Sequence, residues 1–234
     1  MSPDRKTLFI LLQSALIQDL DATSSTTIKL TRHNTRLLAY EVRHREPKLV
    51  AEYVVQLPLY QDQTTTTPTQ LTAAQSELLA LNDHQFLVLA RDSSAGFTTK
   101  SPGSVYRSVD LLDISAATNI AGTAYDSPSA SVAPKGVLNG AITPASYQKF
   151  LDINDNAQLN RFGLHNGAPN DSNDLYEKWE SMAVVRSAIG RPRTTTSCSS
   201  GATTISSPRT ATWPVNPTRM RRGPMSTRWF WSIG

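Results

Sequence analysis

The sequence has almost no cysteine, because its single example, Cys198, lies near the C-terminal end. Residues 1–185 therefore have neither a thiol pair for a disulfide nor a thiolate for a metal site. Long apolar runs are missing too, since no stretch approaches the roughly 18 residues that cross a bilayer. The sequence thus predicts no disulfide framework and no membrane span.

Acidic residues and lysine are missing from one part of the chain only. Residues 1–185 have 15 Lys and Arg against 19 Asp and Glu, a net charge of −4, whereas residues 186–234 have eight Arg and no acid, a net charge of +8. The overall charge of +4 therefore belongs to the tail, and the acidic remainder offers no basic face for a nucleic acid. We predict no nucleic-acid partner.

The N-terminal residues only faintly resemble a signal peptide. Arg5 and Lys6 precede an apolar run, but Gln13 and Ser14 interrupt it. The stretch 2–6 instead favours a tight turn that leads into a strand, although a cleaved signal is the alternative.

Short apolar segments separated by polar turns predict an all-β fold, either a sandwich, a barrel or a propeller. The two segments 37–42 and 49–55 flank a charged loop that ends in Pro47, which is typical of a hairpin. The other predicted strands are 8–12, 86–89, 105–111 and 182–185, and long loops are expected over 61–70, 127–140 and 154–174.

A short internal repeat favours a propeller. Residues 77–81 and 180–184 share the order Glu, any residue, apolar, Ala, apolar, and the first copy leads through a turn to 86–89. Residues 3–12 resemble the second half of such a unit, whose first half would precede Met1. The alternative is a chance similarity of five-residue strings.

The tail, residues 186–234, has a different composition from the rest. It has 17 Ser and Thr among 49 residues and lacks Leu, Tyr, Gln and His as well as Lys and every acid. Disorder is the ordinary interpretation of such a composition. A frame error is our preferred hypothesis, because a one-base shift through Arg228–Ser232 would encode an apolar strand containing Val-Leu-Val. We therefore divide the chain into a domain at 1–185 and a disordered tail at 186–234.

Several motifs in residues 2–185 resemble the phytase-like family, which is also described as esterase-like activity of phytase. The matching motifs are Ser2-Pro3-Asp4, Asn34-Thr35-Arg36-Leu37-Leu38-Ala39-Tyr40, Ser76-Glu77-Leu78, Phe86-Leu87-Val88-Leu89-Ala90-Arg91-Asp92 and Lys178-Trp179-Glu180. The resemblance implies a larger, exported parent protein of propeller type, of which this chain would be a part.

The resemblance also implies hydrolysis of a small phosphoester or ester substrate by recurring acidic residues. The matching positions are Glu77, Glu180, Asp92 and Arg91. Two glutamates that lead into apolar strands would share a central site, where they would hold a metal or act as a general base toward water. The alternatives are solvated acids at strand ends for the glutamates and a local salt bridge for Arg91.

The stretch Asp152, Asn154, Asp155 and Asn156 places oxygen ligands at close spacing, as Ca²⁺ prefers. It is not an EF-hand, because Ala157 replaces the turn glycine and Gly163 replaces the bidentate glutamate. An Asx-turn loop that caps its own backbone is the alternative to a Ca²⁺ site.

Other hydrolase motifs do not fit. The stretch 43–47 lacks the glycine and the second arginine spacing of a histidine acid phosphatase loop, and the sequence has no Gly-x-Ser-x-Gly elbow. Three hypotheses remain: a metal-assisted phosphoester or ester hydrolase, a non-catalytic binding module of propeller type, and a defective gene product that does not fold.

Overall fold

The computed structural model describes residues 1–234 apart from 44, 63–68, 93–102, 176–178 and 185–234. The chain divides into two units, Met1–Lys178 and Trp179–Gly234. Residues 179–184 are the described part of the second unit, and the predicted tail lies outside the described residues. None of the helices that the structure describes is long and apolar enough to cross a membrane.

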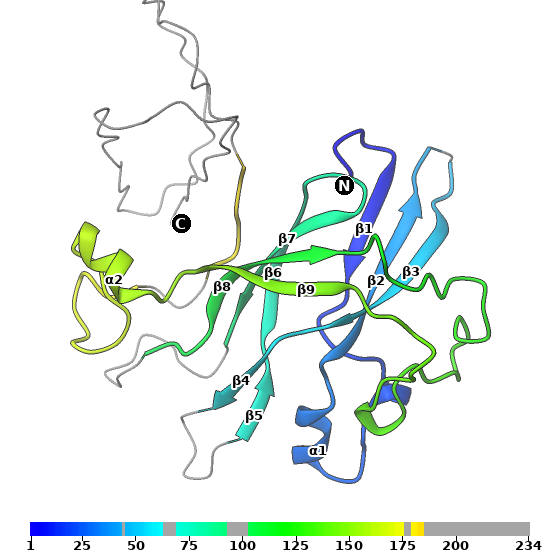
Figure 1. Cartoon of the computed structure of the whole chain (residues 1–234), viewed down its shortest axis with the longest axis horizontal. Coiled ribbons are helices and arrows are strands. Elements are labelled where there is room, and N and C mark those ends of the chain that lie inside the picture. The colour runs from blue at the N-terminus through cyan, green and yellow to red at the C-terminus, as the bar shows by residue number, and fades with distance from the viewer. Residues whose placement is uncertain (44, 63–68, 93–102, 176–178, 185–234) are drawn as a thin grey trace, which may run out of the picture. The chain divides into compact units, whose positions relative to one another are not determined.

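The first unit is mainly β, as the sequence predicts, and begins with a three-stranded antiparallel sheet (Figure 1). The strand order is β1-β2-β3, with bounds Thr7–Leu11, Asn34–Glu41 and Lys48–Gln56. Pairing of Leu37 with Tyr53 and of Glu41 with Lys48 confirms the predicted hairpin. Apolar and β-branched residues dominate these strands because such side chains pack well on a pleated surface.

A four-stranded antiparallel meander forms the second sheet. Its order is β6-β7-β8-β9, with bounds Ala74–Ala80, Gln85–Arg91, Arg107–Asp113 and Ser146–Asp152. Five consecutive residues of β7, Phe86–Ala90, are buried. A strand that is apolar on both faces has to be covered on both faces. The apolar sequence of β7 therefore agrees with its place inside the sheet, between β6 and β8.

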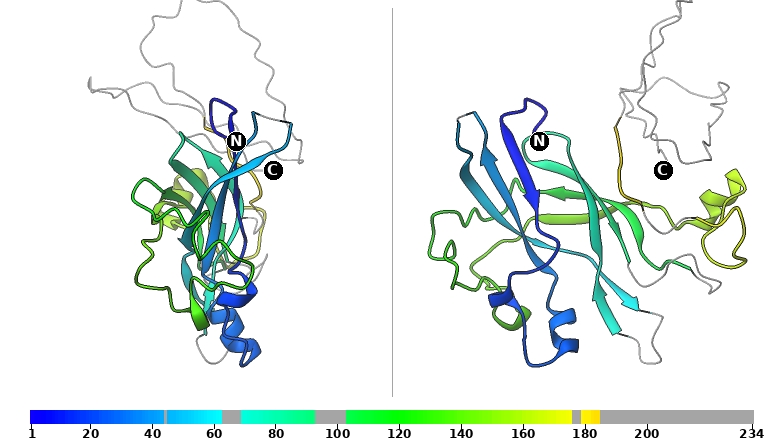
Figure 2. Two further views of the ribbon diagram at one scale, coloured as in Figure 1. Left: turned by 90° about the vertical axis from the view of Figure 1, so that its right-hand side faces the viewer. Right: turned by 180° about the vertical axis from the view of Figure 1, so that it is seen from behind.

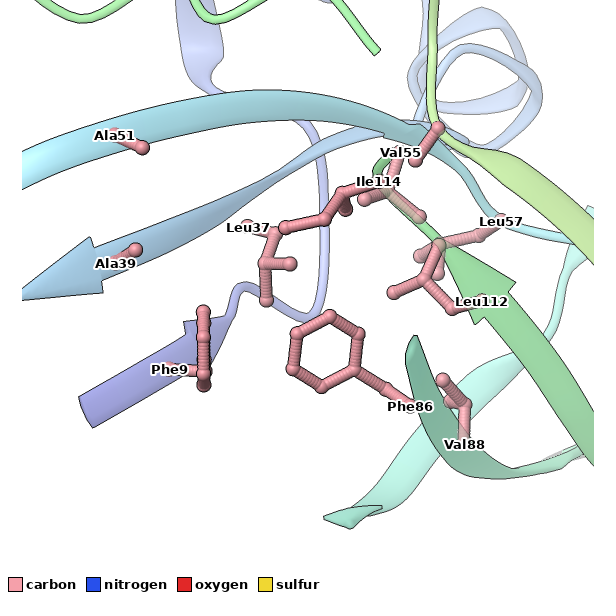
Figure 3. Close-up of a cluster of buried hydrophobic side chains, with 11 residues drawn as sticks. Phe9, Leu37, Ala39, Ala51, Val55, Leu57, Phe86, Val88, Leu112 and Ile114 are labelled. Atoms are coloured by element: carbon pink, nitrogen blue, oxygen red, sulfur yellow. The ribbon is translucent and has the colours of Figure 1, made fainter. Parts of the chain in front are cut away.

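The three-stranded and the four-stranded sheet of this unit share one hydrophobic core (Figure 3). Phe9 on β1 and Phe86 on β7 meet edge to face, with ring centroids 4.6 Å apart. Leu37 of β2 and Leu112 of β8 extend the cluster, and both are fully buried. Because this core draws on both sheets, neither sheet buries its apolar face alone.

Short elements connect the strands (Figure 2). Helix α1 begins after Ser24, whose side chain accepts a hydrogen bond from the Thr27 backbone in a capping box, and α1 lies beside β5. The bounds are η1 Ile17–Asp19, α1 Ser25–Leu30, β4 Leu59–Asp62, β5 Thr69–Thr72, η2 Pro134–Gly136, α2 Asn156–Leu159 and η3 Asn160–Phe162.

The connection between β8 and β9 crosses to the other sheet. Its first part is tied to β3 by the hydrogen bond from the Ile120 amide to the Glu52 carbonyl, and its last part by that from the Ala145 amide to the Val54 carbonyl. Ile120 and Val132 from this connection then pack on Val54 in a second buried cluster. The long predicted loop at 127–140 is therefore part of the packed structure.

Three charged side chains are buried beneath that connection. The Arg36 guanidinium lies between Glu52 and Asp19, 3.3 Å from the Asp19 carboxylate. Asp19 in turn accepts hydrogen bonds from the backbone amides of Val132 and Ala133. The triad therefore joins β2, β3, η1 and the crossing connection.

Candidate functional site

Glu77 lies on β6, one of the two edge strands of the four-stranded sheet, at a register irregularity between Gln75 and Glu77. Its pairing with Leu89 places it on the sheet face opposite to that of Leu78, which packs on the shared core. The side chain is half-buried, and burial raises the pKa of the Glu77 carboxyl above its ordinary value. Within the described residues, no hydrogen bond or ion pair engages this carboxylate.

Arg91 ends β7 close to the same irregularity. Its Nε donates to the hydroxyl of Ser76, the residue before Glu77, over 3.3 Å, and a terminal nitrogen donates to the Asp92 carbonyl over 3.4 Å. Arg91 is also paired across the ladder with Arg107. The structure therefore brings Arg91 beside the strand segment that carries Glu77.

Asp92 is buried, and both of its carboxylate oxygens accept hydrogen bonds. It receives hydrogen bonds from the Ser104 hydroxyl at 2.8 Å, the Val105 amide at 2.7 Å and the Tyr106 amide at 3.4 Å. These bonds fasten the chain that leads into β8 to the end of β7. The geometry thus gives Asp92 a positioning role in the fold.

The predicted metal-binding stretch meets Asp92 through Ser104. Asn154 donates to the Ser104 hydroxyl at 3.1 Å, while its own side-chain oxygen accepts from Arg107 Nε at 3.0 Å. Asn156 accepts from the backbone amide of Asn166 at 2.7 Å. The structure therefore places Asp92 and the 152–156 stretch at the same end of the four-stranded sheet.

The two aspartates of that stretch also have local partners. Asp152 forms an exposed ion pair with Lys149 at 2.7 Å and accepts from the Asn154 amide. Asp155 caps helix α2 by accepting from the Ala157 amide. The donor set suits a hard cation, yet each of the four residues has an oxygen already engaged, so the four do not fit one Ca²⁺ ion as they stand. Among the described residues, no group of three or more acidic, His or Cys side chains could hold a metal.

Buried Arg107 and Asn166 organise this end of the sheet, and the sequence analysis missed both. Arg107 donates to the Asn166 side-chain oxygen at 2.7 Å and to the Leu175 carbonyl at 3.3 Å. Gly103 and Gly167 approach so closely that a Cβ on Gly103 would lie 3.0 Å from the Gly167 backbone. Single side chains spread over 70 residues carry no sequence signal that would have linked them.

Asp110 is a second residue that the sequence analysis missed. It is fully buried on β8, and it accepts hydrogen bonds from the hydroxyls of Ser108, Tyr106 and Tyr147, the two tyrosines at 3.0 Å each. Burial raises the pKa of the Asp110 carboxyl despite these donors, and it also raises the pKa of both tyrosines. The alternation of Tyr106, Ser108 and Asp110 at the start of β8 was a usable signal, because a period of two along an extended chain places them on one face.

Glu180 belongs to the second unit, where the structure describes residues 179–184. Glu77 belongs to the first unit, so a shared site for the two glutamates stays a prediction. The pocket lined by Leu111, Asp113, Ser115, Ala116, Ser146 and Gln148 contains none of the predicted site residues.

Antiparallel sheets that pack on one core define a mainly β protein, which is the fold class that the sequence predicted. The chain belongs to the phytase-like family, described as esterase-like activity of phytase, whose model matches residues 1–199. An uncharacterized secreted protein of Arthroderma benhamiae is 40% identical to it over 189 residues, which are 79% of this chain and 36% of that relative. The chain thus spans about a third of the relative's length, and no solved structure matches it.

Proposed function

We propose that the chain is the part of a phosphoester or ester hydrolase that supplies Glu77 as the general base. The observation that carries the proposal is the state of this carboxylate: it is half-buried on an edge strand, its pKa is raised by burial, and no described residue forms a hydrogen bond or ion pair with it. Perturbed carboxyls beside irregularities in strands are typical of catalytic positions. Membership of the phytase-like family supports the reaction class.

In this proposal the Glu77 carboxylate removes a proton from water while the water oxygen forms a bond to phosphorus or to a carbonyl carbon. The bond to the alkoxide then breaks, and the alcohol leaves after it takes up the proton. Arg91, next to the Ser76–Glu77 segment, would orient an anionic phosphoryl group. No step passes through Ca²⁺, because the four residues of the 152–156 stretch already have partners.

The test compares wild type, Glu77→Gln and Glu41→Gln on p-nitrophenyl phosphate, bis(p-nitrophenyl) phosphate and p-nitrophenyl acetate. Glu41 is a matched control because it is a strand glutamate that pairs with exposed Arg43. We expect Glu77→Gln to lose about 10²-fold or more in kcat and Glu41→Gln to keep it. Wild-type activity should rise as the pH passes upward through the raised pKa of Glu77, since the base is the deprotonated form.

Chelation separates the metal proposal from the carboxylate proposal. If activity survives EDTA and still depends on Glu77, the carboxylate mechanism operates without Ca²⁺. If EDTA abolishes activity and added Ca²⁺ alone restores it, the result supports an ion at Asp152 and Asp155. Equal rates for wild type and Glu77→Gln would refute the proposal.

A non-catalytic binding module of propeller type is the second candidate. It is favoured by the hydrogen bonds to both carboxylate oxygens of Asp92 and by the structural contacts of Asn154 and Asn156. Absence of hydrolysis of all three substrates by a chain that melts cooperatively would select this candidate. We also propose that the parent protein is exported, in line with the name of the fungal relative, and recovery of the longer gene product from culture medium would test this.

A further inference from the structure

Residues 170–172 form an Asn-x-Ser triplet, the motif that accepts N-linked glycans in exported proteins. It is the single such triplet among the 234 residues, because the related stretch 216–218 has proline at its middle position, which blocks acceptance. Short motifs also arise by chance. The place of the triplet in the fold therefore decides whether it can carry a glycan.

The triplet lies on the loop 163–175, which follows η3. The two sides of this loop are joined by main-chain hydrogen bonds: the His165 amide donates to the Asn173 carbonyl at 3.0 Å, and the Leu175 amide donates to the His165 carbonyl at 2.9 Å. Residues 168–172 lie between these joined sides, and every one of them is exposed. The acceptor position is thus on a closed, solvent-facing part of the loop, where a bulky polar group has room.

The side chain of Asn170 differs from those of the asparagines around it. Asn154, Asn156 and Asn166 each use their side chains to hold neighbouring segments together. No hydrogen bond from the described residues reaches the side-chain amide of Asn170. A sugar on its nitrogen therefore displaces no contact that the described part of the fold depends on.

The other two residues of the triplet have separate roles in the loop. Asp171 shapes the turn, because its carboxylate accepts from the Asn173 amide at 2.7 Å and lies 3.1 Å from Nε2 of His165. Ser172 is exposed, and its hydroxyl donates over 3.4 Å to the Asn173 side-chain oxygen, which is a long hydrogen bond. The motif thus requires the two residues whose side chains contribute least to the structure of the loop.

We propose that Asn170 is an N-glycosylation site, which accepts an oligosaccharide from a lipid-diphosphate donor during export. The Asn170 side-chain nitrogen forms a bond to the anomeric carbon of the first sugar, and the bond from that carbon to the diphosphate oxygen breaks. The nitrogen loses one proton as the lipid diphosphate leaves. This proposal rests on the export of the parent protein proposed above, and it is independent of hydrolysis and of Glu77.

The test expresses the full chain behind a secretory leader in yeast and examines both the medium and the cell extract. Supplying the leader separates acceptance of a glycan from natural export, which recovery of the longer gene product tests by itself. We expect wild type to lose mass in a single step when peptide N-glycosidase removes the glycan. The enzyme leaves an aspartate in place of the modified asparagine, and peptide mass spectrometry should find it at position 170. The same chain without the leader should lose no mass.

Four variants separate the motif from its surroundings. Asn170→Gln and Ser172→Ala each remove a group that the motif requires, so both should abolish the modification, whereas Ser172→Thr keeps a hydroxyl and should retain it. Asn160→Gln is the matched control. Asn160 is exposed and has no side-chain hydrogen bond among the described residues, but Phe162 stands where the motif needs Ser or Thr, so this variant should keep the glycan.

The fold should tolerate the glycan, because the Asn170 side chain makes no contact that it would displace. Glycosylated and enzyme-treated chains should therefore have the same circular dichroism and the same melting midpoint.

Three results would overturn the proposal. One is leader-directed wild type that loses no mass with the enzyme in either medium or extract. Another is a glycan that persists in Asn170→Gln, because the acceptor would then lie elsewhere. The third is a glycan that lowers the melting midpoint, because position 170 would then be covered in the folded chain.

Discussion

Buried Asp110 shows how a single carboxyl makes stability depend on pH. Its pKa is raised in the folded protein mainly by burial, although Ser108, Tyr106 and Tyr147 donate hydrogen bonds to it. A raised pKa means that the folded state binds the proton more tightly than the unfolded state does. The stabilisation is complete below the ordinary pKa of about 3.8 and is lost as the pH rises through the raised value.

In wild type, the free energy of unfolding should fall by up to about 1.4 kcal/mol per pH unit between those two pKa values. We expect the Asp110→Asn variant to lack this fall. Urea unfolding at several pH values from 4 to 7 measures this. Asp113 on the same strand is the control, because hydrogen bonds from Ser115 lower its pKa. The contribution of Asp113 has the opposite pH dependence, because wild type loses this stabilisation as the pH falls. Asp113→Asn should remove that loss. An unchanged pH slope in Asp110→Asn would contradict the argument.

The predicted site residues illustrate the limit of sequence reasoning at this scale. Glu77 and Arg91 could be placed near each other because they lie on the two strands of one predicted repeat unit, and these strands pair in the structure. The bonds of Asp92 and Asn154 could not be predicted, since they meet through Ser104, whose importance depends on contacts over 12 and 50 residues of sequence. A run of closely spaced Asp and Asn residues does not distinguish a cation site from a network of Asx turns and helix caps.

At the scale of elements, the Arg36 triad ties two strands to η1 and to the crossing connection. Arg36, Glu52 and Asp19 are all at least 95% buried as side chains. Removal of the Arg36 cation would leave two buried carboxylates without a compensating charge. We expect Arg36→Met to lower the free energy of unfolding by about 3–5 kcal/mol in urea titrations.

The double variant Arg36→Met with Glu52→Gln provides the control for that measurement. It removes one of the two uncompensated charges and should recover part of the loss. If Arg36→Met alone proves neutral, the triad contributes little to stability.

Elements with a clear sequence pattern were predicted well. The apolar segments 8–12, 37–42, 49–55 and 86–89 correspond to β1, β2, β3 and β7, and their ends moved by a few residues. Strand β9 was missed because its alternation is broken: the consecutive residues Gln148, Lys149 and Phe150 are all exposed on this edge strand. Helix α1 depends on a capping box of hydroxyl groups, which is a weak signal in a stretch rich in Ser and Thr.

At the scale of the whole first unit, the two sheets depend on each other because one core joins them. Phe86 is fully buried between Phe9 of one sheet and its own neighbours in the other. We expect Phe86→Ala to cost about 3–5 kcal/mol and to lower the stability of both sheets together. Hydrogen exchange should show equal loss of protection in β2 and β8, whereas a loss confined to β8 would indicate sheets that unfold separately.

The sequence predicted the fold class and the hairpin of β2 and β3, but it did not predict how the sheets of the first unit meet. The edge-to-face contact of Phe9 with Phe86 joins residues 77 positions apart, and nothing local in the sequence specifies it. The crossing of residues 114–145 onto β3 was equally hidden, because its apolar positions Ile120 and Val132 stand among turn residues. Long-range pairing is decided by shape and burial, which a single sequence does not display.

The crossing connection has a consequence for how this protein can vary. Both of its ends are fastened to the same strand, through Ile120 and Ala145, so the tip around Pro128 and Ser129 is a closed, solvent-facing arc. Doubling the length of such an arc costs only about 0.6 kcal/mol of closure entropy. Pro128 is therefore the natural point for inserting a tag, a reporter or a whole additional module, with the sheets beneath left undisturbed.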